Sequence, residues 1–409
     1  MPLSLYAASA SAGEDRNPLF TPLRLPCGAV LRNRIMKSAM SDRLADGSGH
    51  PTDAQAALYR KWSQGGAAVS IIGEVQGDAR FPEAAGNLVL DGESDLNRFA
   101  RLAREGMRGG GQLWLQLGHA GALTDPAIGT PKGPSALDLP ELSSVALKAD
   151  EIAALPALFA RTARLAQVAG FGGVQLHAAH GFLLSQFLSP LFNRREDAYG
   201  GSIEARMQIV LEIVDAVRAA VGPAFPIAIK INATDRLDGG LTETDALKFV
   251  AALEQSSIDL IEISGGTYFP GAPATSEHRG SGAYFASFAR SARSMTAKPL
   301  LLTGGIKTMD QAEKIISEGT ADGVGLARAF AIIPEVTNLW RRGEATAPAF
   351  PRFTSPPEGG VTAWYTMRLA EIAEDMDHLS GNNLDQAVVT YTDREQRKAD
   401  TWRSHFDYV

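Results

Sequence analysis

The chain of 409 residues is long enough for two or three average domains or for a single α/β barrel with insertions. Its formal net charge of −7 argues against a nucleic-acid surface, and no apolar run approaches the roughly 18–20 residues that span a bilayer. The single cysteine, Cys27, excludes a disulfide framework within the chain and any multi-cysteine iron–sulfur or zinc site.

The first 34 residues precede the first predicted strand, and we expect them to form an arm or a hairpin across the floor of the fold. Residues 1–17 have the small residues of a cleavage site, but they have no basic segment and only a short apolar stretch. We therefore interpret them as a flexible arm on a cytoplasmic protein.

From Ile35 onward, short apolar runs alternate with helix-length amphipathic segments. The predicted strands are Ile35–Met40, Ala67–Val75, Gln112–Leu117, Gly173–His177, Pro226–Asn232, Asp259–Ser264, Pro299–Gly304 and Gly323–Arg328. The predicted helices are Asp53–Gln64, Asp95–Met107, Glu151–Val168, Ile203–Val221, Glu243–Gln255, Phe285–Met295 and Met309–Ser317. The alternation indicates a parallel sheet, and its spacing favours a closed (β/α)₈ barrel over residues 35–342 rather than an open doubly wound sheet.

Capping signatures support three of the predicted helices, because a threonine is followed three residues later by a glutamine or aspartate. The pairs are Thr52 with Gln55, Thr242 with Asp245, and Thr308 with Gln311. Pro156 is expected to kink the third predicted helix or to mark its first turn.

Two histidines, His177 and His180, lie where the fourth predicted strand gives way to a long loop that ends near the helix cap Ser202. Connections longer than about 12–15 residues inside a compact domain are usually functional. We expect this loop to form the mouth of an active site.

Residues 343–409 follow the last barrel unit. Their first part contains four prolines, between positions 348 and 357, and a helix is predicted over Trp364–Met376. We expect this extension to pack on the barrel or on a partner subunit.

A phosphate site is predicted at the ends of the last two strands, where barrel enzymes often hold a phosphate group. Gly304 and Gly305 allow backbone amides to approach an anion, and the helix capped at Thr308 adds a favourable dipole. Arg328 can grip phosphate with paired donors. The alternative is that the glycines serve only tight turns and that Arg328 forms a surface ion pair.

By the alternation of the fifth predicted strand, the Lys230 side chain faces the otherwise apolar interior of the barrel, where a buried lysine needs a partner. It is expected to face an anion or a polarised ligand atom; the alternative is a structural pair with a core carboxylate such as Glu262. Gln116 adds a polar group at the end of the third strand.

The histidine pair has three interpretations. A metal site would need further ligands, and the nearby Glu196 and Asp197 are better interpreted as loop charges, so no metal is predicted. Simple packing is the second interpretation. The favoured one is that both imidazoles donate to a substrate oxygen and polarise a carbonyl group.

Taken together, these residues resemble the Old Yellow Enzyme family of FMN-dependent oxidoreductases over about residues 17–345. The motifs that carry the resemblance are Asn33-Arg34-Ile35, Ser38–Ser41, Gln116–Gly121, His177–Gly181, the run LLSQFLSPLFNR over Leu183–Arg194, Tyr199–Gly201 and the two phosphate strands. The His-x-x-His pair is similar to that of a bacterial branch. The branch with an iron–sulfur cluster and a further domain does not match a chain with one cysteine that ends at residue 409.

The resemblance implies a role for each matched residue. Backbone groups of Ala39, Met40 and Val75 would line the isoalloxazine ring, and Ser41 would stand where the family has Thr or Cys at the flavin carbonyl edge. Gln116 would bind the pyrimidine edge of the flavin, Lys230 would lie by its N1–C2 carbonyl region, and His177 would also contact the cofactor. The phosphate would be held by Gly304, Gly305, Ala327 and Arg328, and the substrate oxygen by His177 and His180.

Phe182 departs from the family pattern, which has a proton-donating tyrosine at this position. Because general-acid assistance is typically worth ~10²–10⁴-fold, reduction of an enone would be slower, or the proton would come from water or another phenol such as Tyr268 or Tyr284. Alternatively, the acceptor needs no such proton.

The resemblance therefore implies an enzyme that takes hydride from NADPH or NADH on FMN and passes it to an α,β-unsaturated carbonyl or a similar small-molecule acceptor, in a ping-pong mechanism. The alternatives are a flavin-dependent dehydrogenase or demethylase of an amine or alcohol, and a non-redox lyase or isomerase that binds phosphate. The expected partners are a small-molecule substrate and further copies of the chain in a dimer or tetramer, with no nucleic acid and no membrane.

Overall fold

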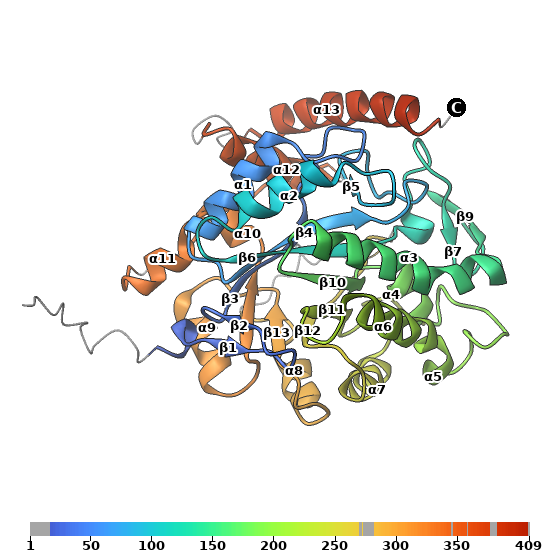
Figure 1. Ribbon diagram of the computed structural model, residues 1–409, viewed down its shortest axis with the longest axis horizontal. Helices are drawn as coiled ribbons and strands as arrows, with labels where there is room; N and C mark the ends of the chain where they lie inside the picture. Colours follow the sequence, from blue (N-terminus) through green and yellow to red (C-terminus); the bar gives the residue numbers. More distant parts are fainter. Residues whose placement is uncertain are drawn as a thin grey trace, which may run out of the picture.

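The computed structural model describes residues 17–269, 272, 282–344, 347–357, 359–376 and 383–407. Eight parallel strands close into a barrel because the last strand pairs with the first, with Val324 opposite Ile35 (Figure 1). The strands are β3 (Ile35–Ser41), β4 (Val69–Gln76), β6 (Gln112–Gly118), β10 (Gly173–Ala178), β11 (Ile227–Asn232), β12 (Leu260–Ser264), β13 (Leu300–Thr303) and β14 (Gly323–Leu326). The predicted (β/α)₈ barrel is confirmed. A short strand, β5 (Leu88–Val89), extends the sheet beside β4.

The strand ends differ from the prediction mainly at β14, which ends at Leu326 instead of Arg328. Arg328 opens the short helix α10 (Arg328–Ile332) directly after the strand.

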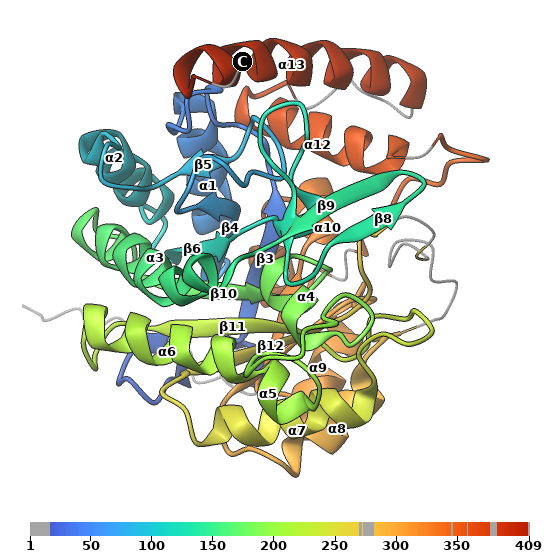
Figure 2. The same ribbon diagram turned by 90° about the vertical axis from the view of Figure 1, so that its right-hand side faces the viewer.

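Helices surround the barrel (Figures 1 and 2). They are α1 (Asp53–Gln64), α2 (Leu96–Gly106), α3 (Ala149–Val168), α6 (Gln208–Val221), α7 (Glu243–Glu254), α8 (Ala286–Arg293), α9 (Met309–Ser317) and α11 (Val336–Arg341). The three predicted threonine caps are present, because each hydroxyl accepts a bond from the backbone amide three residues on. Pro156 lies inside α3, beyond its first turn. The single helix predicted over Ile203–Val221 is instead two, α5 (Ile203–Arg206) and α6, which meet at Met207.

Two apolar layers stabilise the barrel. The larger one lies between the sheet and the surrounding helices and includes Leu115, Phe249 and Trp340, each almost fully buried. The smaller one fills the barrel floor, where Met36, Ile71 and Trp114 point inward. Polar groups therefore enter the barrel interior only above this floor.

The segment before β3 forms a hairpin of β1 (Leu23–Arg24) and β2 (Val30–Leu31), and its leucines pack on the floor cluster. The Asn33-Arg34 pair fixes this lower end. The Asn33 side chain accepts from the Ile35 amide at 2.9 Å and donates to the Gly66 carbonyl at 2.9 Å. This motif therefore has a structural role.

Several described elements were not predicted. Three short strands, β7 (Lys132–Gly133), β8 (Leu137–Leu139) and β9 (Leu142–Ala146), form a small sheet after β6. The loop after β10 contains a buried helix, α4 (Leu183–Leu188).

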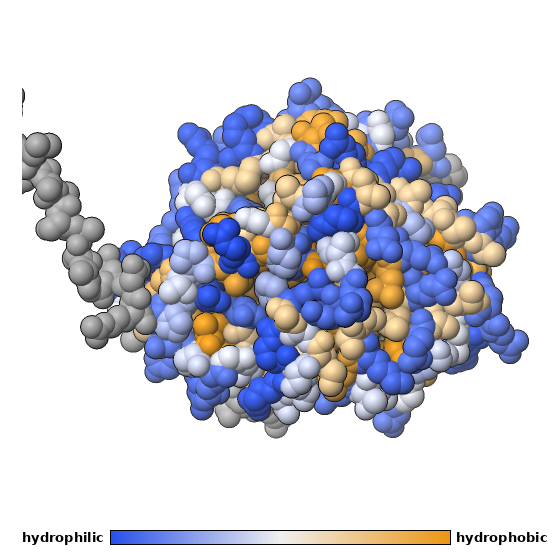
Figure 3. Space-filling view, turned by 60° about the horizontal axis from the view of Figure 1, so that its bottom comes forward, coloured by the Kyte–Doolittle hydropathy of each residue, from blue (hydrophilic) through white to orange (hydrophobic). Residues whose placement is uncertain are grey.

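Residues after the barrel form α12 (Gly360–Ala373) and α13 (Leu384–His405), of which the sequence predicted only the first, starting later at Trp364. In both ribbon views α13 lies outermost, over α12 (Figures 1 and 2). None of the described helices combines the length and the apolar character that a membrane span requires. The face in Figure 3 intersperses hydrophilic and hydrophobic residues.

Candidate active site

A chain of hydrogen bonds crosses the barrel interior directly above the apolar floor. Gln116 Nε2 donates to Gln175 Oε1 at 2.7 Å, and Gln175 Nε2 donates to Glu262 Oε2 at 2.7 Å. The other carboxylate oxygen of Glu262 accepts from the Thr303 hydroxyl at 2.7 Å, and Ser38 bonds to Thr303 at 2.9 Å. These bonds link five strands and give hydrogen-bond partners to buried polar side chains, which backbone pairing between strands does not supply.

Lys230 joins this network, with Nζ 3.4 Å from Glu262 Oε1 and only 3% of its side chain exposed. The alternative pairing considered from the sequence is therefore present. Burial raises the pKa of Glu262, but the Lys230 ammonium and the hydrogen bonds outweigh it, so the pKa of this carboxyl lies below its ordinary value. The pair places a positive charge inside the barrel, below the upper strand ends.

His177 and His180 come together at the end of β10, with ring centroids 5.2 Å apart and planes at 90°. Burial lowers the pKa of both imidazoles well below 6.5; Lys230 lowers both further, and His180 adds to the shift of His177. Both rings are therefore neutral at pH 7, and each offers one N–H donor and one acceptor nitrogen.

The backbone at His180 is shaped by its neighbours. His180 has φ +61° and Gly181 has φ +84°, and a Cβ at Gly181 would lie 2.1 Å from Thr267 Oγ1. The His180 amide donates to Asn232 Oδ1 at 3.0 Å, while its ring Nε2 lies 2.8 Å from Ser264 Oγ. The ends of β11 and β12 thus fix the position of this imidazole.

Phe182 lies against the histidines, with its ring 4.8 Å from that of His177 and 3% of the residue exposed. Of the two phenols considered as substitutes, only Tyr268 is here: its ring is 5.7 Å from His180 and 5.9 Å from Phe182. The ring of Tyr284 packs instead over Gly304 and Gly305.

The long run after the histidines has a structural role that its sequence did not reveal. Gln186, in α4, accepts from the Ala122 amide and donates to the carbonyls of Ala120 and Gly181. The side chains of Asn193 and Arg206 donate to backbone carbonyls elsewhere in the same loop and so fix its other turns. Asp197 pairs with Arg195 at 3.0 Å, as expected for a loop charge. Within the described ranges, no group of three or more His, Cys, Asp or Glu side chains could hold a metal ion.

Ala39, Met40 and Ser41 end β3 and are partly exposed, whereas Val75, on the neighbouring strand β4, is buried. Ser41 donates to Glu83 Oε2 at 2.8 Å, and Arg43 binds the other oxygen of Glu83 at 2.7 Å. Burial raises the pKa of Glu83, but Arg43 and three hydrogen bonds outweigh it and lower the pKa below 4.5. The sequence did not reveal this carboxylate.

The predicted phosphate residues lie side by side, because Thr303 pairs with Gly325 at the ends of β13 and β14. Gly304 and Gly305 have φ values of +108° and +79°, and both remain partly exposed. Ala327 and Arg328 follow on the next strand, and the Arg328 guanidinium lies 5.9 Å from the Tyr365 ring centroid.

A second carboxyl at the barrel top was also missed. Glu74, in β4, lies against His177 and is only 4% exposed. A glutamate in the apolar run Ser70-Ile-Ile-Gly-Glu-Val75 carries the same sequence signal that identified Lys230, and it could have been found in this way.

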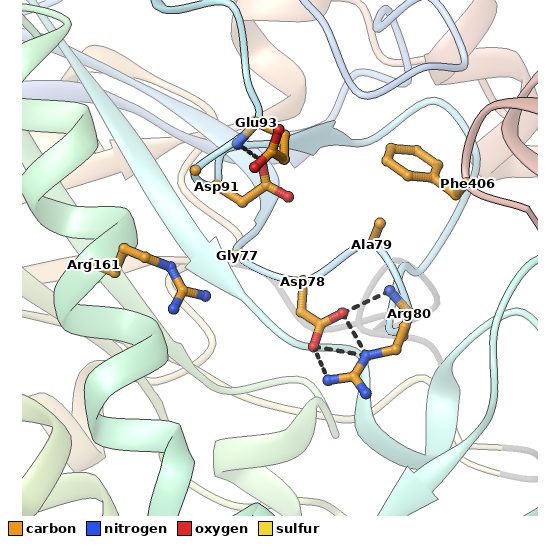
Figure 4. Close-up of a pocket in the computed structure, with 9 residues that line it drawn as sticks. Gly77, Asp78, Ala79, Arg80, Asp91, Glu93, Arg161 and Phe406 are labelled. Atoms are coloured by element: carbon orange, nitrogen blue, oxygen red, sulfur yellow. Dashed lines mark hydrogen bonds and ion pairs between the residues drawn. The ribbon is translucent and has the colours of Figure 1, made fainter.

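A surface cleft of about 480 Å³ lies apart from the histidines, between the loop after β4, α3 and the end of α13 (Figure 4). Its lining includes both signs of charge, but Asp78 is already bound to Arg80 at 2.9 Å. None of the predicted site residues lines this cleft.

Comparisons with known proteins agree on one family. A family model described as NADH:flavin oxidoreductase / NADH oxidase matches residues 18–345. The NADH-dependent flavin oxidoreductase iliE of Hypocrea jecorina (strain QM6a) is 34% identical over 350 residues, which cover 76% of this chain and 86% of the relative. The metal reductase of Desulforamulus reducens is 37% identical over 327 residues, which cover 78% of this chain but only 48% of that protein. Among solved structures, morphinone reductase in complex with tetrahydroNAD aligns with a TM-score of 0.69 at 25% identity, covering 81% of this chain and 93% of that one.

Proposed function

Because the chain belongs to the NADH:flavin oxidoreductase / NADH oxidase family, we propose its substrate class and site residues on that premise. It is an NAD(P)H-dependent FMN oxidoreductase of the Old Yellow Enzyme type. The second substrate is an α,β-unsaturated carbonyl or a similarly electrophilic small molecule. The nicotinamide and this acceptor occupy the same place in turn, in a ping-pong sequence. Bound FMN supplies the hydride acceptor in the first half-reaction and the hydride donor in the second.

The residues at the strand ends fit FMN at both of its ends. Gly304 and Gly305 have positive φ values and remain partly exposed, and Arg328 follows on the adjacent strand, so this corner would hold the phosphate. At the other end, Gln116 and Lys230 present a donor group and a positive charge inside the barrel. These would contact the pyrimidine part of the flavin together with His177.

The wall of the flavin site would come from the first two strands of the barrel. A Cβ at Gly73 would lie 3.1 Å from both the Ala39 Cβ and Gln116 Oε1, so β3, β4 and β6 approach closely there. Backbone groups of Ala39, Met40 and Val75 would line the ring. The Ser41 hydroxyl, whose proton is directed to Glu83, would present its lone pairs to the ring edge.

The observation that carries the proposal is the pair of neutral, buried imidazoles beside a buried cation. His177 and His180 lie 5.2 Å apart at one strand end, and Lys230 lies two positions before the end of the neighbouring strand β11. An imidazole N–H directed at the carbonyl oxygen of the acceptor would draw charge from the alkene and prepare its β-carbon for hydride. We propose that His180 supplies this donor and that His177, beside it, positions the acceptor.

Anaerobic mixing of the FMN-loaded protein with NADPH or NADH tests the first half-reaction. We expect the nicotinamide to bleach the flavin rapidly, and cyclohexenone added afterwards to restore its colour. Bleaching by an amine or an alcohol, and not by either nicotinamide, would contradict the proposal and identify a dehydrogenase. Comparing the two nicotinamides also establishes which one the protein prefers.

A further inference from the structure

Glu74 is a buried carboxyl at the top of the barrel to which the function proposed above gives no role. Its Oε1 lies 3.2 Å from His177 Nε2, and the side chains of both residues are at least 96% buried, with exposures of 4% and 2%. Among the described residues, its second oxygen, Oε2, has no hydrogen-bond partner. An unpartnered buried oxygen of this kind is costly, and such groups in native proteins often serve function.

The carboxyl fits into space that a neighbouring strand leaves open. Gly118, at the end of β6, lacks a Cβ, and a Cβ built there would lie 1.8 Å from Glu74 Oε2. Any other residue at position 118 would push the carboxyl out of its place. Three strands, β4, β6 and β10, therefore combine to seat one acid group against His177.

The hydrogen bonds of His177 show which way its proton points. The Ala179 amide donates to Nδ1 at 3.3 Å, so Nδ1 is the acceptor nitrogen of the neutral ring. The ring proton is then on Nε2, where it faces Glu74 Oε1. The Nε2–H group can therefore donate to Glu74 Oε1 whether the carboxyl is protonated or ionised, and the imidazole stays neutral in both cases.

The surrounding charges determine the protonation state of Glu74. Burial, followed by the carboxylate of Glu83, raises its pKa well above 4.5, and Lys230 on β11 opposes them. His177 and His180 are both neutral. Glu74 therefore retains its proton to a higher pH than an ordinary glutamate does, and this proton lies against His177, beside the proposed acceptor position.

Phe182 and Glu74 both border His177. The ring of Phe182 lies 4.8 Å from the imidazole and has no proton to give. Tyr268, a phenol whose ring lies against those of His180 and Phe182, is 66% exposed. The buried acid that is held in place is Glu74.

Resting on the proposed function, we propose that Glu74, seated against His177 Nε2, donates the proton that completes reduction of the acceptor. The established NAD(P)H-dependent chemistry supplies the hydride, which forms a C–H bond at the β-carbon as the C=C π bond breaks and its electron pair moves onto the enolate. The O–H bond of Glu74 breaks, and a second C–H bond forms at the α-carbon without further transfer of electrons. The carboxylate that remains is stabilised by the Nε2–H of His177 and by Lys230 until water returns the proton.

The test compares two acceptors on the FMN-loaded enzyme, because ferricyanide takes electrons without a proton at carbon. We expect Glu74→Gln to lower the ratio of cyclohexenone turnover to ferricyanide turnover by ~10²–10⁴-fold. Adding Phe182→Tyr to that variant should restore most of the ratio, because the phenol replaces the lost acid. Asp42→Asn, which alters a buried carboxyl that directly follows β3 and accepts from the Tyr59 hydroxyl on α1, is the matched control and should leave the ratio unchanged.

A second measurement does not depend on turnover. The infrared carbonyl band of a protonated carboxyl at neutral pH should be lost in Glu74→Gln, whereas Asp42→Asn should retain this band. An unchanged turnover ratio in Glu74→Gln, the absence of its infrared band, or a larger loss of the ratio in Tyr268→Phe would each overturn the proposal. A wild-type flavin that no nicotinamide bleaches would instead contradict the proposed function.

Discussion

Lys37 allows a stability prediction whose size follows from its surroundings. Its ammonium is buried on the outer side of β3, with no hydrogen-bond partner among the described residues. Nζ lies 4.2 Å from the ring centroid of Trp62 and 5.9 Å from that of Tyr59, both on α1. Burial, reinforced by Lys230 and opposed by Asp42 and Glu262, lowers the pKa of Lys37 from 10.5 to about 7.

We expect Lys37→Met to stabilise the folded protein at neutral pH. Each pKa unit corresponds to about 1.4 kcal/mol, so a fall from 10.5 to about 7 costs the folded state about 5 kcal/mol at pH 7 or below. Attraction of the ammonium to the Trp62 ring offsets about 1–2 kcal/mol of this, which leaves a net gain of about 3 kcal/mol for methionine. Between pH 7 and 10.5 the unfolded lysine retains its proton while the folded one releases it, so the gain shrinks with rising pH and vanishes near 10.5.

Urea unfolding of the FMN-saturated proteins at about pH 7 and about pH 10 measures both the gain and its pH dependence. Lys298→Met is the matched control, because the Lys298 ammonium donates to the carbonyls of Ser256 and Ile258 at 2.9 Å each. The control should be less stable than the wild type. A Lys37→Met protein that is less stable at pH 7, or whose gain is the same at both pH values, would refute the reasoning.

Three further predictions concern the site. His180→Ala should weaken binding of 4-hydroxybenzaldehyde about tenfold, because one hydrogen bond worth about 1.4 kcal/mol is lost, and spectral titration measures this; unchanged binding would mean that His180 does not contact the ligand. Gly325→Ala should destabilise the protein by about 1–3 kcal/mol in thermal unfolding, because the new Cβ would lie 1.9 Å from Thr303 Oγ1; an unchanged midpoint would contradict the interior packing. Glu83→Gln should flatten the loss of stability on acidification, because a carboxylate with a pKa below 4.5 in the folded state stabilises it above that pH and loses this effect as pH falls; equal acid unfolding curves would count against it.

The sequence predicted the barrel well because each inner strand is a short apolar run bounded by helices. Alternation along the fifth strand also located Lys230, and the end of the third strand located Gln116; both side chains face the interior. The same alternation applied to the fourth strand would have indicated Gln175, which completes the interior network with Glu262, the carboxylate already considered as the partner of Lys230. Lys230 and Gln175 therefore follow from periodicity alone.

Other features could not be predicted from local patterns. α4 is buried on every side, so its residues show no amphipathic period. In α13 the buried residues are Ala387, Ala399 and Trp402, too few to give a helical signal in a mostly polar segment. The seat of Glu74 depends on the absence of a side chain at Gly118, which is a relation between two strands.

The contact of α13 with the end of β3 has a consequence for how this enzyme can change. Tyr391 and Glu395 both bind the guanidinium of Arg43, which also holds Glu83 and, through it, the Ser41 hydroxyl. Tyr391 and Arg43 are 348 positions apart in the chain. Substitutions on this outer helix can therefore adjust the polarity around Ser41, at the proposed flavin edge, while every barrel strand keeps its sequence, and directed evolution of acceptor preference could begin on the helix.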